Sequence, residues 1–122
     1  MDIYREEILE HWKNPQNFGK MDKPDVIVEQ VNPLCGDKVT FFFKIKRGKV
    51  QDARFTGSGC AISLASSSIL SEAIKGKSIK AISKITGQDV LGFIGGSVAP
   101  ARLKCAFLAL EALKRLGDSK LV

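Results

Sequence analysis

The chain has 122 residues, of which 44% are hydrophobic and 26% are charged, and these values predict one ordinary globular domain spanning residues 1–122. A domain of this length needs no disulfide bonds, and no apolar run approaches the ~20 residues that cross a bilayer. The net charge is +6, but the basic residues are scattered and lack interleaved aromatic residues, so we expect no nucleic-acid partner. The polar, acidic first residues do not form a signal peptide, so we expect a cytoplasmic protein without a membrane partner.

The first half of the chain predicts one helix and then three strands. The helix starts at Asp2 and has Tyr4, Ile8 and Trp12 on its apolar side. The strands are expected at residues 26–31, 38–46 and 49–56. In the middle strand, apolar and polar residues alternate with period two, and Arg47-Gly48 supplies the following turn. These features predict an antiparallel three-stranded meander.

The second half predicts helices. They are expected at residues 61–75, 78–85, 88–94 and 100–117. The 61–75 helix is rich in Ser and Ala and has Ile62, Ala65, Ile69 and Ala73 on one side, and the last helix has Leu103, Phe107, Leu110 and Leu113 on one side. The order of elements predicts an α+β fold in which a three-stranded antiparallel sheet packs against a helical layer.

The three cysteines lie at boundaries between the expected elements. Cys35 lies in a Pro/Gly turn between two strands, Cys60 directly precedes a helix, and Cys105 lies early in the last helix. An odd number of widely spaced cysteines argues against a disulfide framework and against a CxxC zinc knuckle. If the three thiolates converge, they form a soft metal site suited to zinc or to iron–sulfur chemistry.

A fourth ligand can come from Asp37 or from His11. Asp37 lies two residues after Cys35, and an extended chain directs such residues to the same side. Its alternative role is that of a turn residue that binds local backbone amides. His11 is the only histidine, and we expect it to be a half-exposed residue of the first helix rather than a ligand.

Three segments around the cysteines carry a resemblance to a known family. They are Asn32-Pro33-Leu34-Cys35-Gly36-Asp37, Gly59-Cys60-Ala61-Ile62-Ser63 and Pro100-Ala101-Arg102-Leu103-Lys104-Cys105-Ala106. Together they resemble the U-type iron–sulfur cluster scaffolds, namely IscU, SufU and the N-terminal domain of NifU. The resemblance covers nearly the whole chain and includes the SufE/NifU-like sandwich fold.

The resemblance implies a scaffold protein, not an enzyme, that assembles a labile 2Fe–2S cluster and transfers it. Sulfur comes from a cysteine desulfurase, and the cluster passes to recipient apo-proteins or carrier proteins. Cys35, Cys60 and Cys105 are the implied thiolate ligands, and Asp37 is the implied oxygen ligand. A carboxylate binds such a centre more weakly than a fourth thiolate, so this corner of the cluster can open. The scaffold is expected to be a monomer or a weak homo-oligomer.

Two features leave the branch of the family open. Lys104 occupies the position at which IscU has a histidine, and in this respect the chain resembles SufU. The short spacing between Cys60 and Cys105, in contrast, resembles IscU or NifU. The alternative function is therefore that of a zinc-dependent sulfurtransferase in which Cys105 accepts persulfide sulfur, with zinc bound in the cluster-free form. Lys104 and Arg102 can lie near either centre, and an ammonium group at Lys104 would lower the pKa of Cys105. Residues 98–102 match the Leu-Pro-Pro-Val-Lys segment of IscU poorly, so no dedicated Hsp70 chaperone is inferred.

Overall fold

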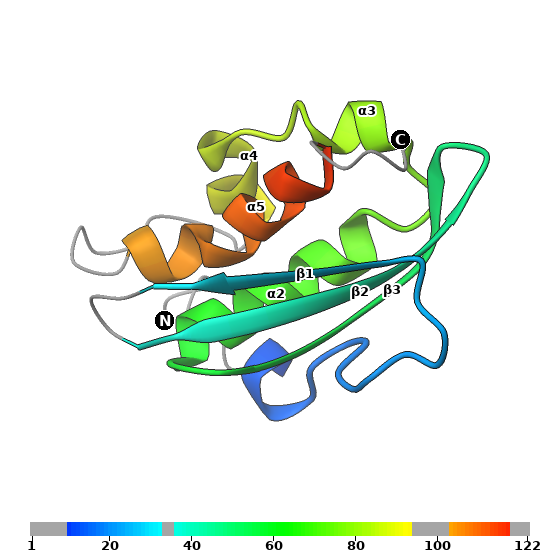
Figure 1. Cartoon of the computed structure of the whole chain (residues 1–122). Helices are drawn as coiled ribbons and strands as arrows, with labels where there is room; N and C mark the ends of the chain where they lie inside the picture. Colours follow the sequence, from blue (N-terminus) through cyan, green and yellow to red (C-terminus); the bar gives the residue numbers. More distant parts are fainter. Residues whose placement is uncertain (1–9, 33–35, 94–102, 118–122) are drawn as a thin grey trace.

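The fold is given by a computed structural model in which residues 10–32, 36–93 and 103–117 are described (Figure 1). Its elements are β1 (Val26–Val31), β2 (Lys38–Lys46), β3 (Lys49–Ser58), α2 (Ala61–Ala73), α3 (Ile79–Ile82), α4 (Gly87–Phe93) and α5 (Leu103–Gly117). Residues 10–13 are also helical. The predicted α+β fold is confirmed. Within the described ranges, no helix has the length and apolar character needed to cross a membrane.

The three strands form one antiparallel sheet in the order β1-β2-β3. The bounds of β1 and β2 are those predicted, and β3 extends two residues further than expected, to Ser58. The alternation predicted for β2 is present over most of the strand, because Val39, Phe41 and Phe43 are buried and their neighbours are more exposed, except for Phe42, which is buried as well. The register pairs Lys38, the first residue of β2, with Ser58, the last residue of β3. This pairing brings the segments that precede β2 and follow β3 together at one end of the sheet.

The helices cover one face of the sheet, where α2 contacts β3 and α5 contacts β1 and β2 (Figure 1). The hydrophobic core lies between these layers and contains Phe41 and Phe43 of β2 and Phe55 of β3. The rings of Phe41 and Phe43 stack with centroids 5.7 Å apart, and Phe41 lies 5.8 Å from Phe55. Leu70 of α2 and Leu113 of α5 complete this core. The α2 and α5 helices also pack against each other, which positions the start of each helix.

The α2 helix is buried on more sides than its sequence predicts. Its serines are buried as well as its aliphatic residues, namely Ser63, Ser66, Ser67, Ser68 and Ser71. The side chain of Ser67 donates to the carbonyl of Ser63, so part of this polarity is satisfied inside the helix. Other serine hydroxyls bind the segment that precedes β1. The prediction of one apolar side was therefore incomplete, because the second buried side of the helix is polar.

The segment at residues 10–19 packs on α2 and on β3 through polar contacts. The backbone N–H of Gln16 donates to Ser68 Oγ at 2.7 Å, and the Asn17 side chain donates to Ser71 Oγ at 3.0 Å. The backbone of Asn17 accepts a hydrogen bond from Phe55 of β3. Trp12, expected on an apolar side, is 47% exposed, and the rest of that predicted helix lies outside the described residues.

We expect Gly57→Ala to destabilise the fold by about 1–3 kcal/mol, because overpacking a tight contact forces the backbone to move. A Cβ at residue 57 would lie 2.6 Å from the carbonyl oxygen of Lys38, across the β2–β3 pairing. Urea unfolding followed by circular dichroism measures the change in the free energy of unfolding. Gly92→Ala is the matched control, because a Cβ there meets no atom within 4 Å in the described structure and Ala favours the α4 helix. Equal stabilities of the two variants would contradict this account of Gly57.

Candidate metal centre

Asp37 is positioned by the turn that leads into β2. The backbone N–H of Asn32 donates to the carbonyl of Asp37, and the N–H of Gly36 donates to the carbonyl of Asn32, both at 2.8 Å. Gly36 has φ +76, in the left-handed region that glycine adopts without steric cost. The side chain of Asp37 is only 6% exposed, and its Oδ2 atom has no hydrogen-bond partner among the described residues. Among the described residues, this oxygen binds no backbone amide, which leaves it available to a ligand.

Cys60 lies at the N-terminus of α2, directly after β3. Its backbone is extended, and its carbonyl accepts a hydrogen bond from Leu64 N–H at 3.2 Å, which begins the helix. The thiol makes no capping hydrogen bond, so it is not used to satisfy the helix end. The free N–H groups and the dipole at a helix N-terminus favour a negative charge there. The sulfur atom of Cys60 is therefore available as a ligand atom at the start of α2.

Cys105 reaches the same point from the first turn of α5. The helix packs on α2 in this region through a small cluster that includes Ala106 and Ile69. Cys105 is only 6% exposed, whereas Cys60 is partly exposed. Burial, together with the adjacent Cys60 and Asp37 side chains, raises the pKa of the Cys105 thiol to about 12. This direction is opposite to the one expected from a neighbouring Lys104 alone.

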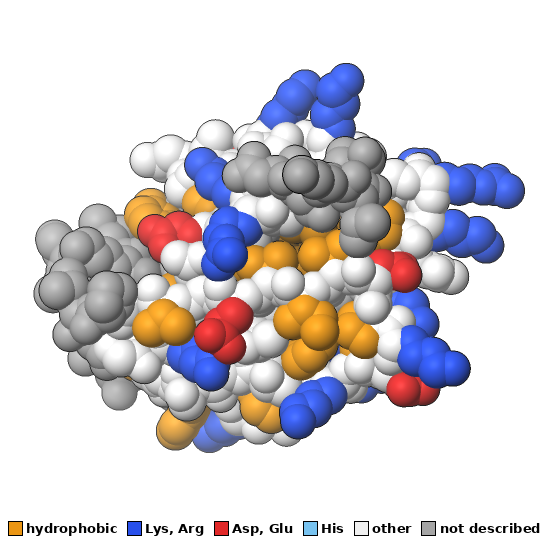
Figure 2. Space-filling view, in the orientation of Figure 1, with side chains coloured by type: hydrophobic (Ala, Val, Ile, Leu, Met, Phe, Trp, Pro, Cys, Tyr) orange, Lys and Arg blue, Asp and Glu red, His pale blue; other side chains and the backbone are white. Residues whose placement is uncertain are grey.

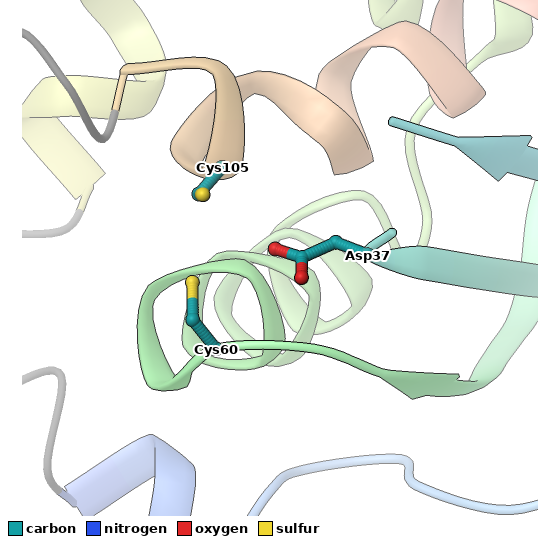
Figure 3. Close-up of side chains that lie close together, drawn as sticks. All are labelled: Asp37, Cys60 and Cys105. Carbon is teal, nitrogen blue, oxygen red and sulfur yellow. The ribbon is translucent and has the colours of Figure 1, made fainter. Parts of the chain in front are cut away.

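The three side chains converge on one point (Figure 3). One carboxylate oxygen of Asp37 and the sulfur atoms of Cys60 and Cys105 all lie within 4.8 Å of one another. Two thiols and an unpartnered carboxylate oxygen form a donor set suited to zinc or iron. A cation between them would supply the partner that Oδ2 lacks and would favour the thiolate form of Cys105. The donor set thus fits a metal centre.

Gly59 and Ser63 shape the centre, and the sequence interpretation did not assign them a role. A Cβ at residue 59 would lie 2.7 Å from Asp37 Cγ and 2.7 Å from Ser63 Oγ, so glycine leaves the space that the carboxylate fills. Ser63 Oγ donates to the Cys60 carbonyl at 3.0 Å and lies 3.8 Å from Cys60 Sγ. The three-residue spacing between Cys60 and Ser63 was the available signal, because it places both on one side of a helix.

Several of the predicted site residues cannot be placed in this centre. Cys35 and Arg102 lie outside the described residues, and only the backbone of Lys104 is described, within α5. His11 lies elsewhere, with Nδ1 2.7 Å from Ser68 Oγ, and is partly buried as expected. Among the described residues, the centre thus contains Asp37, Cys60 and Cys105 of the four predicted ligands.

Residues 3–116 match the family described as NifU-like N terminal domain. The chain is 38% identical to the zinc-dependent sulfurtransferase SufU of Bacillus subtilis, covering 93% of this chain and 88% of that protein. It is 36% identical to the iron–sulfur cluster assembly scaffold protein IscU 1 of Archaeoglobus fulgidus, covering 93% and 73%. A crystal structure of a candidate iron–sulfur cluster assembly scaffold for the SUF system, from Fervidobacterium islandicum, aligns with a TM-score of 0.81 and 29% identity over 93% of this chain and 95% of that one. The chain therefore belongs to the NifU-like N-terminal domain family, together with its IscU and SufU relatives.

Proposed function

We propose that this protein is a cytoplasmic scaffold on which a labile 2Fe–2S cluster is assembled and from which it is transferred. The observation that carries the proposal is the buried carboxylate of Asp37, whose Oδ2 atom has no described hydrogen-bond partner and of which one oxygen lies within 4.8 Å of two cysteine sulfurs. A buried carboxylate oxygen without a partner is costly. Its placement among soft ligands is accounted for when a metal centre is the partner.

In this proposal Cys35, Cys60 and Cys105 supply thiolates and Asp37 supplies the oxygen ligand. The cluster is the cargo, its sulfur comes from a cysteine desulfurase, and recipient apo-proteins or carrier proteins take it up. A carboxylate is a harder and weaker ligand for iron than a thiolate, so an incoming cysteine can displace it. A scaffold that releases its cargo needs one such replaceable ligand. In this role the protein is a carrier rather than an enzyme.

The gaps in the alignments with the relatives support the scaffold role over the sulfurtransferase role. The alignment with IscU 1 spans 113 positions, whereas the alignment with SufU spans 130, which is more than this chain contains. The SufU relative therefore has residues with no counterpart here. The lysine at position 104 is still a feature that resembles SufU, so the sulfurtransferase role remains the second candidate.

The compactness of the centre favours zinc as the ion bound before a cluster forms. With Zn–S distances of about 2.3 Å, a tetrahedral zinc ion separates its ligand atoms by about 3.8 Å. The described ligand atoms lie within 4.8 Å of one another, so they need little movement to bind one ion. A two-iron cluster distributes its ligands over two ions and requires a wider arrangement. This observation supports the zinc-dependent sulfurtransferase as an alternative.

In that alternative, the Cys105 thiolate attacks the terminal sulfur of a persulfide on the desulfurase. A new S–S bond forms at Cys105, the S–S bond on the desulfurase breaks, and the desulfurase cysteine leaves as a thiolate. The proton lost by Cys105 balances the charge of the leaving thiolate, and no external oxidant or reductant is needed.

Elemental analysis after anaerobic purification tests the proposed function. Iron and acid-labile sulfide in nearly equal amounts are expected for a scaffold after incubation with a desulfurase, cysteine and ferrous iron. Ser substitutions at Cys35, Cys60 or Cys105 are each expected to lower the retained iron severalfold while circular dichroism remains unchanged. Zinc without sulfide in the wild-type protein would instead support the sulfurtransferase.

Asp37→Ala is expected to retain its cluster severalfold longer when assembled with added thiol. The thiol can occupy the vacant position, and it binds iron more firmly than the carboxylate does. Transfer to an apo-ferredoxin, followed by visible absorbance, is expected to become correspondingly slower. Asp37→Asn keeps the size and one oxygen but loses the charge, so it serves as the matched control with intermediate behaviour. If decay and transfer are identical in all three proteins, the replaceable-ligand mechanism is wrong.

The alternative predicts a persulfide on Cys105. After zinc-loaded protein is incubated with a desulfurase and cysteine, mass spectrometry should detect an added mass of about 32 Da, one sulfur atom, on the peptide that contains Cys105. Cys105→Ser should remove this adduct without unfolding the protein. An adduct found only on Cys35 or Cys60 would assign the acceptor role to that residue.

A further inference from the structure

A dense group of cations lies at the end of the sheet opposite the metal centre. Its members come from the β2–β3 hairpin and from residues 75–84, and we name them the basic end: Lys44, Lys46, Arg47, Lys49, Lys75, Lys77, Lys80 and Lys84. Backbone hydrogen bonds hold the two segments together, from Val50 to Lys77 at 2.9 Å and from Ile79 to Gly48 at 2.9 Å. Figure 1 shows the hairpin beside α3, and in Figure 2 Lys and Arg side chains project from this end of the molecule.

The charge of the basic end is poorly compensated inside the molecule. Two nearby carboxylates, Asp52 and Glu72, lie close to Lys75, at 3.6 and 3.5 Å, and a third, Asp25, accepts a hydrogen bond from the backbone N–H of Ile45 at 2.7 Å. Across the described parts of the chain, the other seven members of the basic end form no ion pair. Their field is therefore directed toward solvent, where it attracts anionic groups.

The hairpin carries these cations at a cost in local stability. Lys46 is paired directly opposite Lys49, and like charges in that arrangement are destabilising. Arg47 has φ +54 and Gly48 has φ +74, so the two residues form a turn whose first position favours Asn or Gly rather than Arg. Both the Lys46–Lys49 pair and Arg47 in the turn are locally unfavourable, and no contact within the described chain compensates for them. Such unfavourable residues are typical of binding surfaces.

The same residues surround a depression in the surface. Lys46, Arg47 and Lys49 line a pocket of about 470 Å³ together with Val50, Gln51 and Gly76. Three cationic side chains around one shallow pocket can receive carboxylate groups from more than one side. This arrangement fits a segment with several acidic side chains better than a single small anion.

We propose that the basic end is a docking surface for an acidic protein segment, whose Asp and Glu side chains enter the pocket between Lys46, Arg47 and Lys49. Nucleic acid fits less well, because residues 44–52 and 75–84 contain no aromatic side chain on which a base could stack. Seven of the eight cations are lysines, whose flexible point charges suit electrostatic steering of a partner rather than bidentate phosphate recognition. An anionic membrane fits less well too, because the exposed large hydrophobic side chains of the described structure, Trp12, Phe18, Ile27 and Val31, all lie outside the basic end.

This surface lies far from the metal centre. Asp37 directly precedes β2 and Lys46 ends it, so the nine residues of the strand separate the two regions by roughly 30 Å. A partner held at the basic end can therefore remain bound while another protein contacts the cysteines. The simultaneous binding of a second protein at the cysteines rests on the proposed function, whereas docking at the basic end does not.

Fluorescence anisotropy with a labelled peptide of alternating Asp and Glu residues tests the surface. We expect the double variant Lys46→Glu/Lys49→Glu to bind the peptide at least tenfold more weakly than the wild type at low salt. The control Lys13→Glu/Lys20→Glu has the same change in charge at two exposed residues outside the basic end, and it should lose less than threefold. Equal losses in the two variants would show that only net charge matters and would overturn the proposal.

Arg47→Asn separates binding from folding. Asn tolerates the left-handed conformation better than Arg, so the variant should unfold at a higher urea concentration while it binds the peptide more weakly. Amide chemical shifts upon peptide addition should change mainly at residues 46–51 and 75–77, and shifts spread over all lysines would contradict the proposal. Tighter binding of a duplex DNA of equal charge through these same residues would replace the acidic partner with a nucleic acid. Iron and sulfide contents of these variants should equal those of the wild type, which separates a failure here from a failure of the scaffold function.

Discussion

The pairing of β2 with β3 through their outermost residues determines where the metal centre forms. Because Lys38 lies opposite Ser58, the residue before β2 and the residues after β3 must lie side by side. Gly57 permits this pairing, since a Cβ there would meet the Lys38 carbonyl oxygen at 2.6 Å. The α2 helix begins almost at once, so its first turn points to the same place. Asp37, which precedes β2, and Cys60, which follows β3, are thus positioned by one stretch of backbone hydrogen bonds, and α5 supplies the third ligand, Cys105.

The centre is electrostatically unfavourable without a cation. Asp37 is buried beside two thiols, one of its oxygens has no described hydrogen-bond partner, and the pKa of Cys105 is raised to about 12. Desolvation and the negative neighbours act together here, since each disfavours a further negative charge. The aromatic core of Phe41, Phe43 and Phe55 lies in the same sheet and offsets this cost through apolar burial. The fold therefore holds close together three ligands that would repel one another as anions. A bound metal ion would remove this repulsion.

Much of the fold could be predicted from local patterns. The alternation in β2 and the Arg47-Gly48 turn gave the meander, because a half-buried antiparallel strand has a period of two. The burial of the serines in α2 could not be predicted in this way, since their partners, such as Gln16 and Asn17, are distant in sequence. The burial of Asp37 was missed for the same reason. Motif spacing indicates which residues carry ligand atoms, but only packing between α2, α5 and the sheet decides how deeply these atoms lie.

The molecule thus places its two chemically distinct regions at opposite ends of one sheet. At one end, ligands are buried and partly unpartnered among the described residues, and at the other, most of the positive side chains are exposed and only Lys75 forms an ion pair within the described chain. Both regions carry an electrostatic cost that the central core must offset, because contacts within the described chain relieve neither of them fully. Such costs are typical of functional surfaces, where the compensating charge comes from outside the protein. At the buried end this charge is a cation held by soft ligands, and at the exposed end it is an anionic partner. The length of the paired strands β2 and β3 keeps the two regions apart, so that neutralising one need not disturb the other.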